Sequence, residues 1–208
     1  MQSPFTWLII AITALVSWQA FNNRRLVDRL ILWPPAISRR RQYERLISYG
    51  FIHGDWMHLA FNMITLYFFG RQIEQVMAHI SGSSLTFPLF YLAALVMSIL
   101  PSYLKNKDNP NYLSLGASGA VSAVLFAYIL LSPWTWILVM FIPVPAIAYA
   151  VFYVGYSIWM DKQGRDNINH SAHLAGAAFG VLFMLCMEPR IFSIFLESLM
   201  RPQLPSFG

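Results

Sequence analysis

Long runs without a charged residue constrain this chain more than any other feature. Residues 1–23, 75–104, 109–160 and 167–187 contain no Asp, Glu, Lys or Arg. A charge at the centre of a bilayer costs roughly 2.5–3.5 kcal/mol on insertion scales. Charged residues make up 11% of the chain and hydrophobic residues 57%, whereas an ordinary soluble domain is about 25% charged. The chain is therefore predicted to be an all-α, polytopic membrane protein.

Six membrane helices are expected within or beside these runs. The run 109–160 is long enough for two helices, and Ser132 with Pro133 marks the turn between them. Residues 56–76 are more polar but have a helical period, and such a helix is stable in lipid only among other helices. The expected helices are residues 4–21, 56–76, 86–104, 116–131, 135–157 and 170–187. Pro143 and Pro145 should kink the fifth.

The whole chain, residues 1–208, is predicted to form a single membrane domain. Each crossing uses about 20 apolar residues, so little remains for a separate soluble domain. The first loop, 22–55, mixes arginines with Leu30, Ile31 and Trp33 and should lie partly in the membrane interface. The short tail, 188–208, should hold an amphipathic interfacial helix over 191–200.

The positions of Lys and Arg favour one orientation. The expected loops one, three and five hold 11 Lys or Arg residues, whereas the opposite side holds 3, namely Arg71, Arg190 and Arg201. The positive-inside rule would place the odd-numbered loops in the cytoplasm. With no targeting extension and a compact core, a bacterial plasma membrane is the expected location, with an organellar membrane as the alternative.

Several classes of partner are disfavoured. The net charge of +5 arises from loops without an aromatic-interleaved basic helix, which favours acidic lipid headgroups over nucleic acid. Cys186 is the single cysteine, so neither an intrachain disulfide nor a cysteine metal cluster is expected. A metal site would have to use His53, His58, His170 and His173. The chain lacks a His-Glu-x-x-His pattern, so no metal or cofactor is predicted.

Polar residues inside the predicted helices are the functional candidates, because they are costly in lipid. The fourth helix begins with Gly116, Ala117, Ser118 and Gly119, which leave one hydroxyl among residues too small to cover it. Taken alone, this serine is more simply explained by close helix packing and a bond to a carbonyl one turn earlier.

The sixth helix carries His173, followed by Gly176 and Gly180. Small residues at this spacing let a neighbouring helix approach closely. If that neighbour bears Ser118, the imidazole can take the proton of a hydroxyl that is otherwise a weak nucleophile. A structural hydrogen bond or a proton relay is the alternative role for His173.

Two more polar residues share one face of the second helix. His58 and Asn62 are four residues apart, and such side chains can donate to the oxyanion of an acyl-transfer reaction. No acidic residue is placed within the bundle to orient His173, so a two-residue mechanism without a third member is predicted.

Three blocks together resemble the rhomboid family of intramembrane serine proteases. They are residues 45–62 (RLISYGFIHGDWMHLAFN), 116–119 (GASG) and 172–180 (AHLAGAAFG). The resemblance implies a six-helix core in which Ser118 is the nucleophile and His173 the general base. It implies that His58 and Asn62 stabilise the oxyanion, and that Gly116, Gly119, Gly176 and Gly180 allow close packing around the site.

The resemblance also implies an activity and its partners. Transmembrane segments of other membrane proteins would be cleaved after entering near helix five, under a loop at 161–167, with the mouth outside the cytoplasm. That orientation conflicts with the Lys and Arg count, and we follow the resemblance. The chain departs from the family at Ser122, where an aromatic residue often packs on the histidine, and at Glu44, often tryptophan.

Two other functions are kept as alternatives. One is a non-proteolytic, client-binding member of the family, against which the retained Ser118, His173, His58 and Asn62 argue. The other is a small transporter or channel, for which the sequence shows no inverted repeat and few intramembrane charges.

Overall fold

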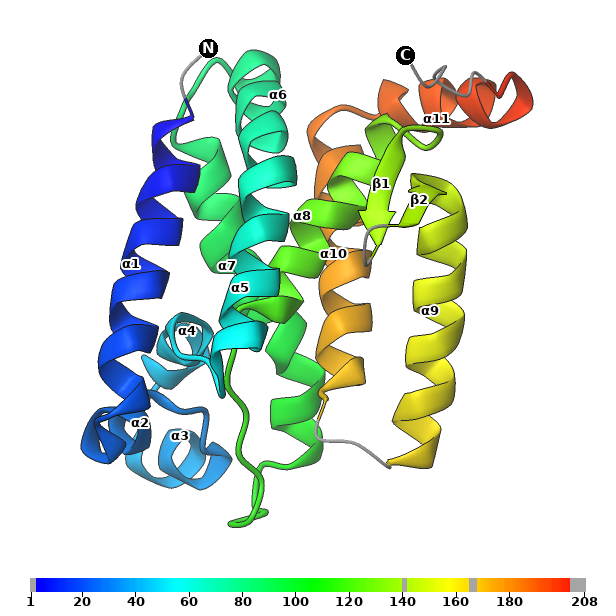
Figure 1. Cartoon of the computed structure of the whole chain (residues 1–208). Coiled ribbons are helices and arrows are strands. Elements are labelled where there is room, and N and C mark those ends of the chain that lie inside the picture. The colour runs from blue at the N-terminus through cyan, green and yellow to red at the C-terminus, as the bar shows by residue number, and fades with distance from the viewer. Residues whose placement is uncertain (1–2, 140–141, 165–167, 203–208) are drawn as a thin grey trace.

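The computed structural model describes residues 3–139, 142–164 and 168–202, and its centre is a bundle of helices (Figure 1). Three helices in the described part are long and apolar enough to cross a membrane: α1 (Pro4–Phe21), α7 (Thr86–Lys105) and α10 (His170–Met187). A shorter apolar helix, α8 (Ser118–Leu131), lies among them. α1 and α10 have the bounds expected from the sequence.

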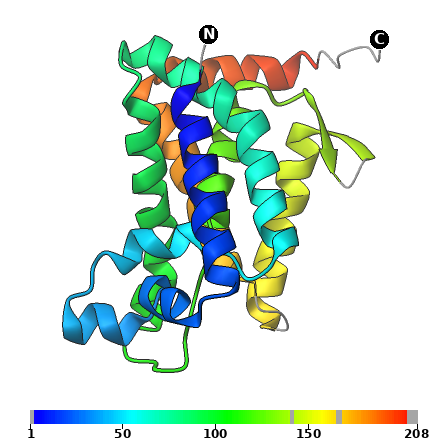
Figure 2. The ribbon, with the colours of Figure 1, turned by 60° about the vertical axis from the view of Figure 1, so that its left-hand side comes forward.

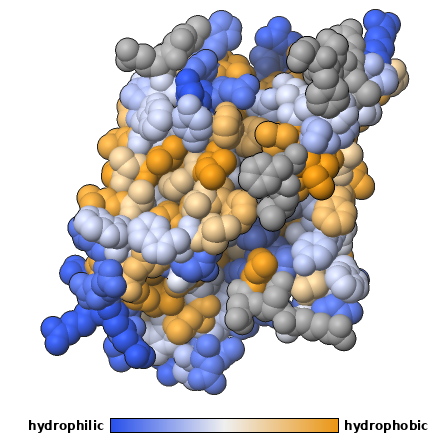
Figure 3. Space-filling model, in the orientation of Figure 1, coloured by the Kyte–Doolittle hydropathy of each residue, from blue (hydrophilic) through white to orange (hydrophobic). Residues whose placement is uncertain are grey.

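Apolar side chains cover the outside of the bundle as well as its core. On α1, Trp7 and Trp18 are more than half exposed, and Leu8, Ile12 and Leu15 are exposed with them. Figure 3 shows apolar side chains across the middle of one face and hydrophilic side chains toward its two ends. An exposed apolar band of this kind is stable in contact with lipid hydrocarbon rather than with water.

The polar second span is one continuous helical segment. α5 (Trp56–Thr65) runs through a π-helical turn, η2 (Leu66–Gly70), into α6 (Arg71–Ser81). The segment extends past the expected end at residue 76 and stops at Gly82, whose φ of 70° is left-handed.

A buried carboxylate on this segment holds the start of α1. Glu74 is 2% exposed and accepts hydrogen bonds from the amides of Phe5 and Thr6 and from the Thr6 hydroxyl. These amides lie in the first turn of α1, where a helix has no carbonyl partners of its own, and the helix dipole favours a negative group there. The Glu74 carboxylate on α6 therefore caps the neighbouring helix α1.

α8 lies in the centre, and almost all of its residues are buried. Its closest neighbour is α10, because Gly176 and Gly180 have no side chain. A Cβ on Gly176 would overlap the backbone of Gly119, and one on Gly180 would overlap the backbone of Ala123. These glycines bring the two helices nearly to backbone contact.

The helix expected at residues 135–157 is wrong at its start. Residues in this region form an antiparallel hairpin of β1 (Trp136–Val139) and β2 (Ile142–Pro145), with Trp136 opposite Pro145 and Leu138 opposite Pro143. Only then does α9 (Ala146–Gln163) begin. Two prolines in three residues remove helical hydrogen bonds and clash with the preceding turn, so they exclude a helix instead of kinking one. A strand in a two-stranded sheet tolerates them.

The loops contain further helices. The first loop forms α2 (Arg24–Leu30), α3 (Pro34–Arg40), α4 (Arg45–Ser48) and the 3-10 turn η1 (Tyr49–Phe51). The tail forms α11 (Arg190–Met200), which lies across one end of the bundle. Figure 2 shows α2 and α3 at the opposite end from α11, and the hairpin projecting to one side. The expected loop at 161–167 falls partly outside the described residues.

Candidate active site

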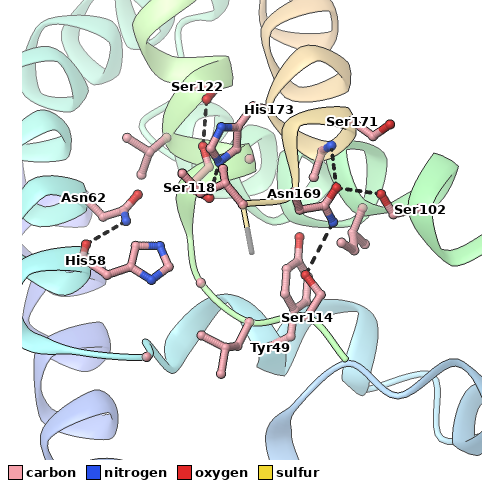
Figure 4. Close-up of a pocket in the computed structure, with 18 of the residues that line it drawn as sticks. Tyr49, His58, Asn62, Ser102, Ser114, Ser118, Ser122, Asn169, Ser171 and His173 are labelled. Atoms are coloured by element: carbon pink, nitrogen blue, oxygen red, sulfur yellow. Dashed lines mark hydrogen bonds between the residues drawn. The ribbon is translucent and has the colours of Figure 1, made fainter. Parts of the chain in front are cut away.

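Ser118 and His173 lie in hydrogen-bond contact. His173 Nε2 is 2.7 Å from Ser118 Oγ, across the interface of α8 and α10 (Figure 4). Both side chains are half-buried, so neither is sealed from the cavity beside them. This is the distance at which an imidazole can take a proton from a hydroxyl.

The turn before Ser118 is fixed from both sides. Gly116 donates its amide to the Tyr49 carbonyl at 2.9 Å, and Ala117 donates its amide to His53 Nε2 at 3.3 Å. Gly116 has a φ of 111°, and a Cβ there would lie 2.5 Å from the His58 ring, so glycine is required. Ser118 consequently begins α8, where the amides of the first turn point away from the helix without carbonyl partners.

His53 acts through hydrogen bonds that define its protonation. Its Nε2 accepts from Ala117, so its Nδ1 carries the proton and lies 2.9 Å from Ser17 Oγ, which in turn donates to the Phe51 carbonyl. Burial lowers the pKa of His53 from 6.5 to about 3. A neutral histidine thus connects α1 to the backbone next to Ser118.

His173 is held by the start of α10. Asn169 caps this helix by accepting from the Ala172 amide, and its side chain also accepts from the Ser102 hydroxyl and donates to the Tyr112 hydroxyl. One amide therefore connects α10 with α7 and the loop before α8. The sequence interpretation did not single out Asn169, although a cap residue before an apolar helix is a recognisable signal.

The sequence interpretation also did not single out Tyr153, which contacts His173 directly. Its ring stacks on His173 with centroids 6.1 Å apart and an interplanar angle of 20°. Its hydroxyl lies 2.7 Å from Ser122 Oγ, and Ser122 donates its only hydroxyl proton to the Ser118 carbonyl, so Tyr153 is the donor. Position 122 thus has no aromatic side chain of its own, and α9 supplies one.

His58 and Asn62 face the pair from α5 (Figure 4). The His58 ring lies against Gly116, and Asp55 caps α5 by accepting from the His58 amide at 2.7 Å. Asn62 is buried and donates one N–H to the His58 carbonyl at 2.8 Å. The second N–H of that amide group remains for a group in the cavity.

A cavity of about 1120 Å³ joins these residues. Its lining is part apolar and part polar. The apolar lining includes Met57, Phe61, Val121, Leu125 and Tyr149, from α5, α8 and α9, and the polar lining includes Asp55, Ser102, Asn106, Asn169 and Ser171. Among the described residues, no three His, Cys, Asp or Glu side chains are grouped to hold a metal.

Comparison with known proteins gives one consistent result. A family model described as the rhomboid domain matches residues 40–190. RHOMBOID-like protein 12, mitochondrial, of Arabidopsis thaliana is 33% identical over 80% of this chain and 53% of its own length. Presenilin-associated rhomboid-like protein, mitochondrial, of Mus musculus is 32% identical over 85% of this chain and 46% of its length.

A third relative agrees with these two. Rhomboid protein 1, mitochondrial, of Saccharomyces cerevisiae is 30% identical over 66% of this chain and 40% of its own length. The chain spans about half the length of the curated relatives it matches. The family model covers well over half of this chain. The matched residues include Ser118 and His173, and also His58 and Asn62 on α5. The chain is a multi-pass membrane protein that belongs to the rhomboid family.

Proposed function

We propose that the chain is an intramembrane serine endopeptidase with a Ser118–His173 dyad, and that its whole length forms one membrane domain of six transmembrane helices. The spans are α1, α5 with α6, α7, α8, α9 and α10. The contact of 2.7 Å between His173 Nε2 and Ser118 Oγ carries this proposal. A serine with an adjacent base, inside an apolar bundle yet beside a polar cavity, suits acyl transfer.

The first step forms an acyl-enzyme. Ser118 Oγ attacks the scissile carbonyl carbon, and its proton passes to His173 Nε2. The negative charge develops on the carbonyl oxygen, where the amides at the start of α8, the second N–H of Asn62 and a protonated nitrogen of His58 can donate. The C–N bond then breaks, and His173 gives its proton to the leaving amine.

The second step needs water. A water molecule loses a proton to His173 while it attacks the ester carbon, and Ser118 Oγ leaves and regains a proton. The polar lining of the cavity, with Asn169 and Ser171, supplies a path for water from the loops. A nucleophile at the loop-facing start of α8 meets this requirement.

The substrate is proposed to be a transmembrane segment of another membrane protein. The apolar lining of the cavity includes Met57 and Phe61 from α5 and Tyr149 from α9, which can accept the apolar side chains of such a segment. A helix in lipid has all its backbone groups paired, so its peptide bonds must be unwound before attack. Helix-destabilising residues near the scissile bond should therefore favour cleavage, and the family resemblance adds a preference for small residues at the bond itself.

The location in the cell stays a prediction. The relatives described above carry mitochondrial names, whereas the sequence interpretation favoured a bacterial plasma membrane. The mechanism is the same in either membrane, because it depends on the bundle and not on the compartment.

Cleavage of a model transmembrane substrate by purified protein tests the proposal. Ser118→Ala and His173→Ala are expected to abolish product, because each removes one half of the proton transfer. Matched controls are Ser83→Ala, which alters an exposed serine outside the cavity, and His79→Ala, which alters an exposed histidine on α6. Both controls should keep the activity.

Other outcomes would assign a different role. Activity that persists in Ser118→Ala would exclude that serine as the nucleophile. An inactive wild type that still binds transmembrane segments would support the client-binding alternative, and labelling of Ser118 by a fluorophosphonate would separate a reactive serine from an inert one.

A further inference from the structure

A second cavity lies at the first loop, outside the candidate active site except for Ile31 and Leu113, which line both. It has a volume of about 670 Å³. Three arginines line it, namely Arg24, Arg40 and Arg45, together with Asp28, so its ionisable side chains carry a net formal charge of +2 (three positive, one negative). Its apolar lining consists of Ala20, Phe21, Val27, Ile31, Trp33 and Leu113.

The cavity lies where the hydrocarbon of a bilayer ends. α1 has 18 residues, which at 1.5 Å per residue span roughly 27 Å, close to the hydrocarbon thickness of about 30 Å. Ala20 and Phe21, at the end of α1, form part of the apolar lining, and Arg24 follows within one turn. Arginine is thus placed at the depth of lipid phosphates, with apolar side chains directly beneath.

The arginines are held in different ways. Arg45 is buried, and it donates to the Gln42 side chain and to the carbonyls of Asp28 and Ile31. The Arg40 guanidinium lies 5.6 Å from the ring centroid of Trp33, an arrangement that restrains its plane. Arg24 and Arg40 are exposed, and in the part of the chain that the structure describes neither is within 4.0 Å of a carboxylate.

We infer that this cavity binds the headgroup of an anionic phospholipid, with Arg24 and Arg40 contacting the phosphate and the apolar lining contacting the first carbons of the acyl chains. Guanidinium groups match phosphate oxygens with paired hydrogen bonds. A soluble phosphate would use the arginines alone and leave the apolar lining exposed to water. Figure 3 shows hydrophilic side chains gathered at the lower left, where Figure 1 places α2 and α3.

Lipid binding is tested on the full chain in nanodiscs and by native mass spectrometry. Wild-type protein should melt at a higher temperature in phosphatidylcholine with added phosphatidylglycerol than in phosphatidylcholine alone, and should retain phosphatidylglycerol adducts. The double variant Arg24→Gln with Arg40→Gln should bind phosphatidylglycerol about 30-fold more weakly, from the usual contribution of one basic side chain near a lipid surface taken twice.

A matched control separates a site from a charge effect. Arg25→Gln with Arg41→Gln removes the same charge from exposed arginines that do not line the cavity, and it should keep the wild-type response. An equal loss in both double variants would overturn the inference in favour of diffuse attraction. An unchanged melting temperature of wild type on adding phosphatidylglycerol would overturn it as well.

Two further arms complete the test. Glycerol phosphate in solution should give no comparable stabilisation, and an equal response would make this a site for soluble anions instead. Each double variant must have the same melting temperature as wild type in phosphatidylcholine alone. Where Arg40→Gln lowers the melting temperature there, Arg40→Lys, which keeps the charge, should restore lipid binding, and its failure to do so would count against phosphate contact.

Discussion

At the scale of residues, Ser122 and Tyr153 show how this chain supports its histidine. The small side chain of Ser122 leaves space beside His173, and Tyr153 from α9 stacks there and donates to the Ser122 hydroxyl. The Ser122 hydroxyl in turn donates a hydrogen bond to the Ser118 carbonyl. Helix α9 is thereby connected to both members of the proposed dyad.

Substitutions at Tyr153 should lower the rate of cleavage through the position of His173. Tyr153→Leu removes the ring and should reduce kcat roughly tenfold, within the range of effects that misplacement of a catalytic group produces. Tyr153→Phe keeps the stacked ring and should retain most of kcat. The measurement is kcat, KM and the pH profile on a transmembrane substrate. An effect confined to KM would show that Tyr153 contacts substrate instead of positioning the base.

His53 makes the stability of the fold sensitive to acid. Its pKa is lowered from 6.5 to about 3 in the folded state. Between these two pH values the histidine is protonated in the unfolded chain and neutral in the folded chain. The stability that this histidine contributes is full above pH 6.5 and decreases as the pH falls toward 3, by up to about 1.4 kcal/mol per pH unit.

The His53→Asn variant separates this effect from other titrating groups. It should be less stable than wild type at neutral pH, because the bonds to Ser17 and Ala117 are altered, and the difference should narrow in mildly acidic solution. Thermal melts of both proteins across this pH range give the comparison. A constant difference would mean that the pKa of His53 is the same in the folded and unfolded chain, which would contradict the lowered value.

At the scale of elements, the contact of α8 with α10 brings the two halves of the proposed site together. Glycine at positions 176 and 180 leaves room for the backbone of Gly119 and Ala123. A side chain at either position would separate the helices and move His173 away from Ser118. The same packing therefore supports both stability and the dyad.

Gly176→Ala should destabilise the fold by about 1–3 kcal/mol, the usual cost of overpacking, and reduce cleavage. Gly155→Ala on α9 is the matched control, because a Cβ there meets nothing within 4 Å. Alanine is a better helix former than glycine, so this variant should be unchanged or slightly more stable. The measurement is the melting temperature of each variant compared with that of wild type. Equal effects would indicate a backbone cause and not packing.

Helix boundaries illustrate what a local pattern can predict. The bounds expected for residues 4–21 and 170–187 coincide with α1 and α10, because an apolar run in lipid must satisfy its own backbone as a helix. The same reasoning was wrong for residues 135–145, where no charge distinguishes a hairpin from a helix. There Pro143 and Pro145 were the decisive signal.

At the scale of the whole molecule, the ends of the bundle differ. The start of α1 and helix α11 lie at one end, and α2, α3 and the loop before α8 lie at the other (Figure 1). The cavity beside Ser118 is lined by residues of that second end. Arg45 is bonded within the fold and Arg40 lies over Trp33, so part of the positive charge of the first loop has a structural role.

Labelling of single cysteines should therefore follow the orientation that the family resemblance implies. Asn109 and Ser83 are exposed and lie beyond opposite ends of α7, which is proposed to cross the membrane. In a Cys186→Ala background, Asn109→Cys should therefore react from outside the cytoplasm and Ser83→Cys from inside. Impermeant maleimide on intact and opened cells gives the measurement. Labelling of Asn109→Cys only from the cytoplasm would support the Lys and Arg count instead. Labelling of both from one side would contradict the bundle.

The sequence by itself determined the membrane character, the helical class and the residues that could do chemistry. Charge-free runs indicate lipid as the solvent, and Ser118 and His173 lie within them, whereas His58 and Asn62 lie in the more polar second span. Short motifs also identified the glycines, because a repeated absence of side chains has a direct steric meaning.

Only the tertiary structure decided how these residues are supported. Tyr153 reaches His173 from another helix, Glu74 caps α1 from 68 residues away, and His53 fixes the amide of Ala117 from 64 residues away. Such contacts leave no periodic trace, since a period reports which face of a helix is apolar and not which helix lies against it. The partners are selected by packing of the complete bundle.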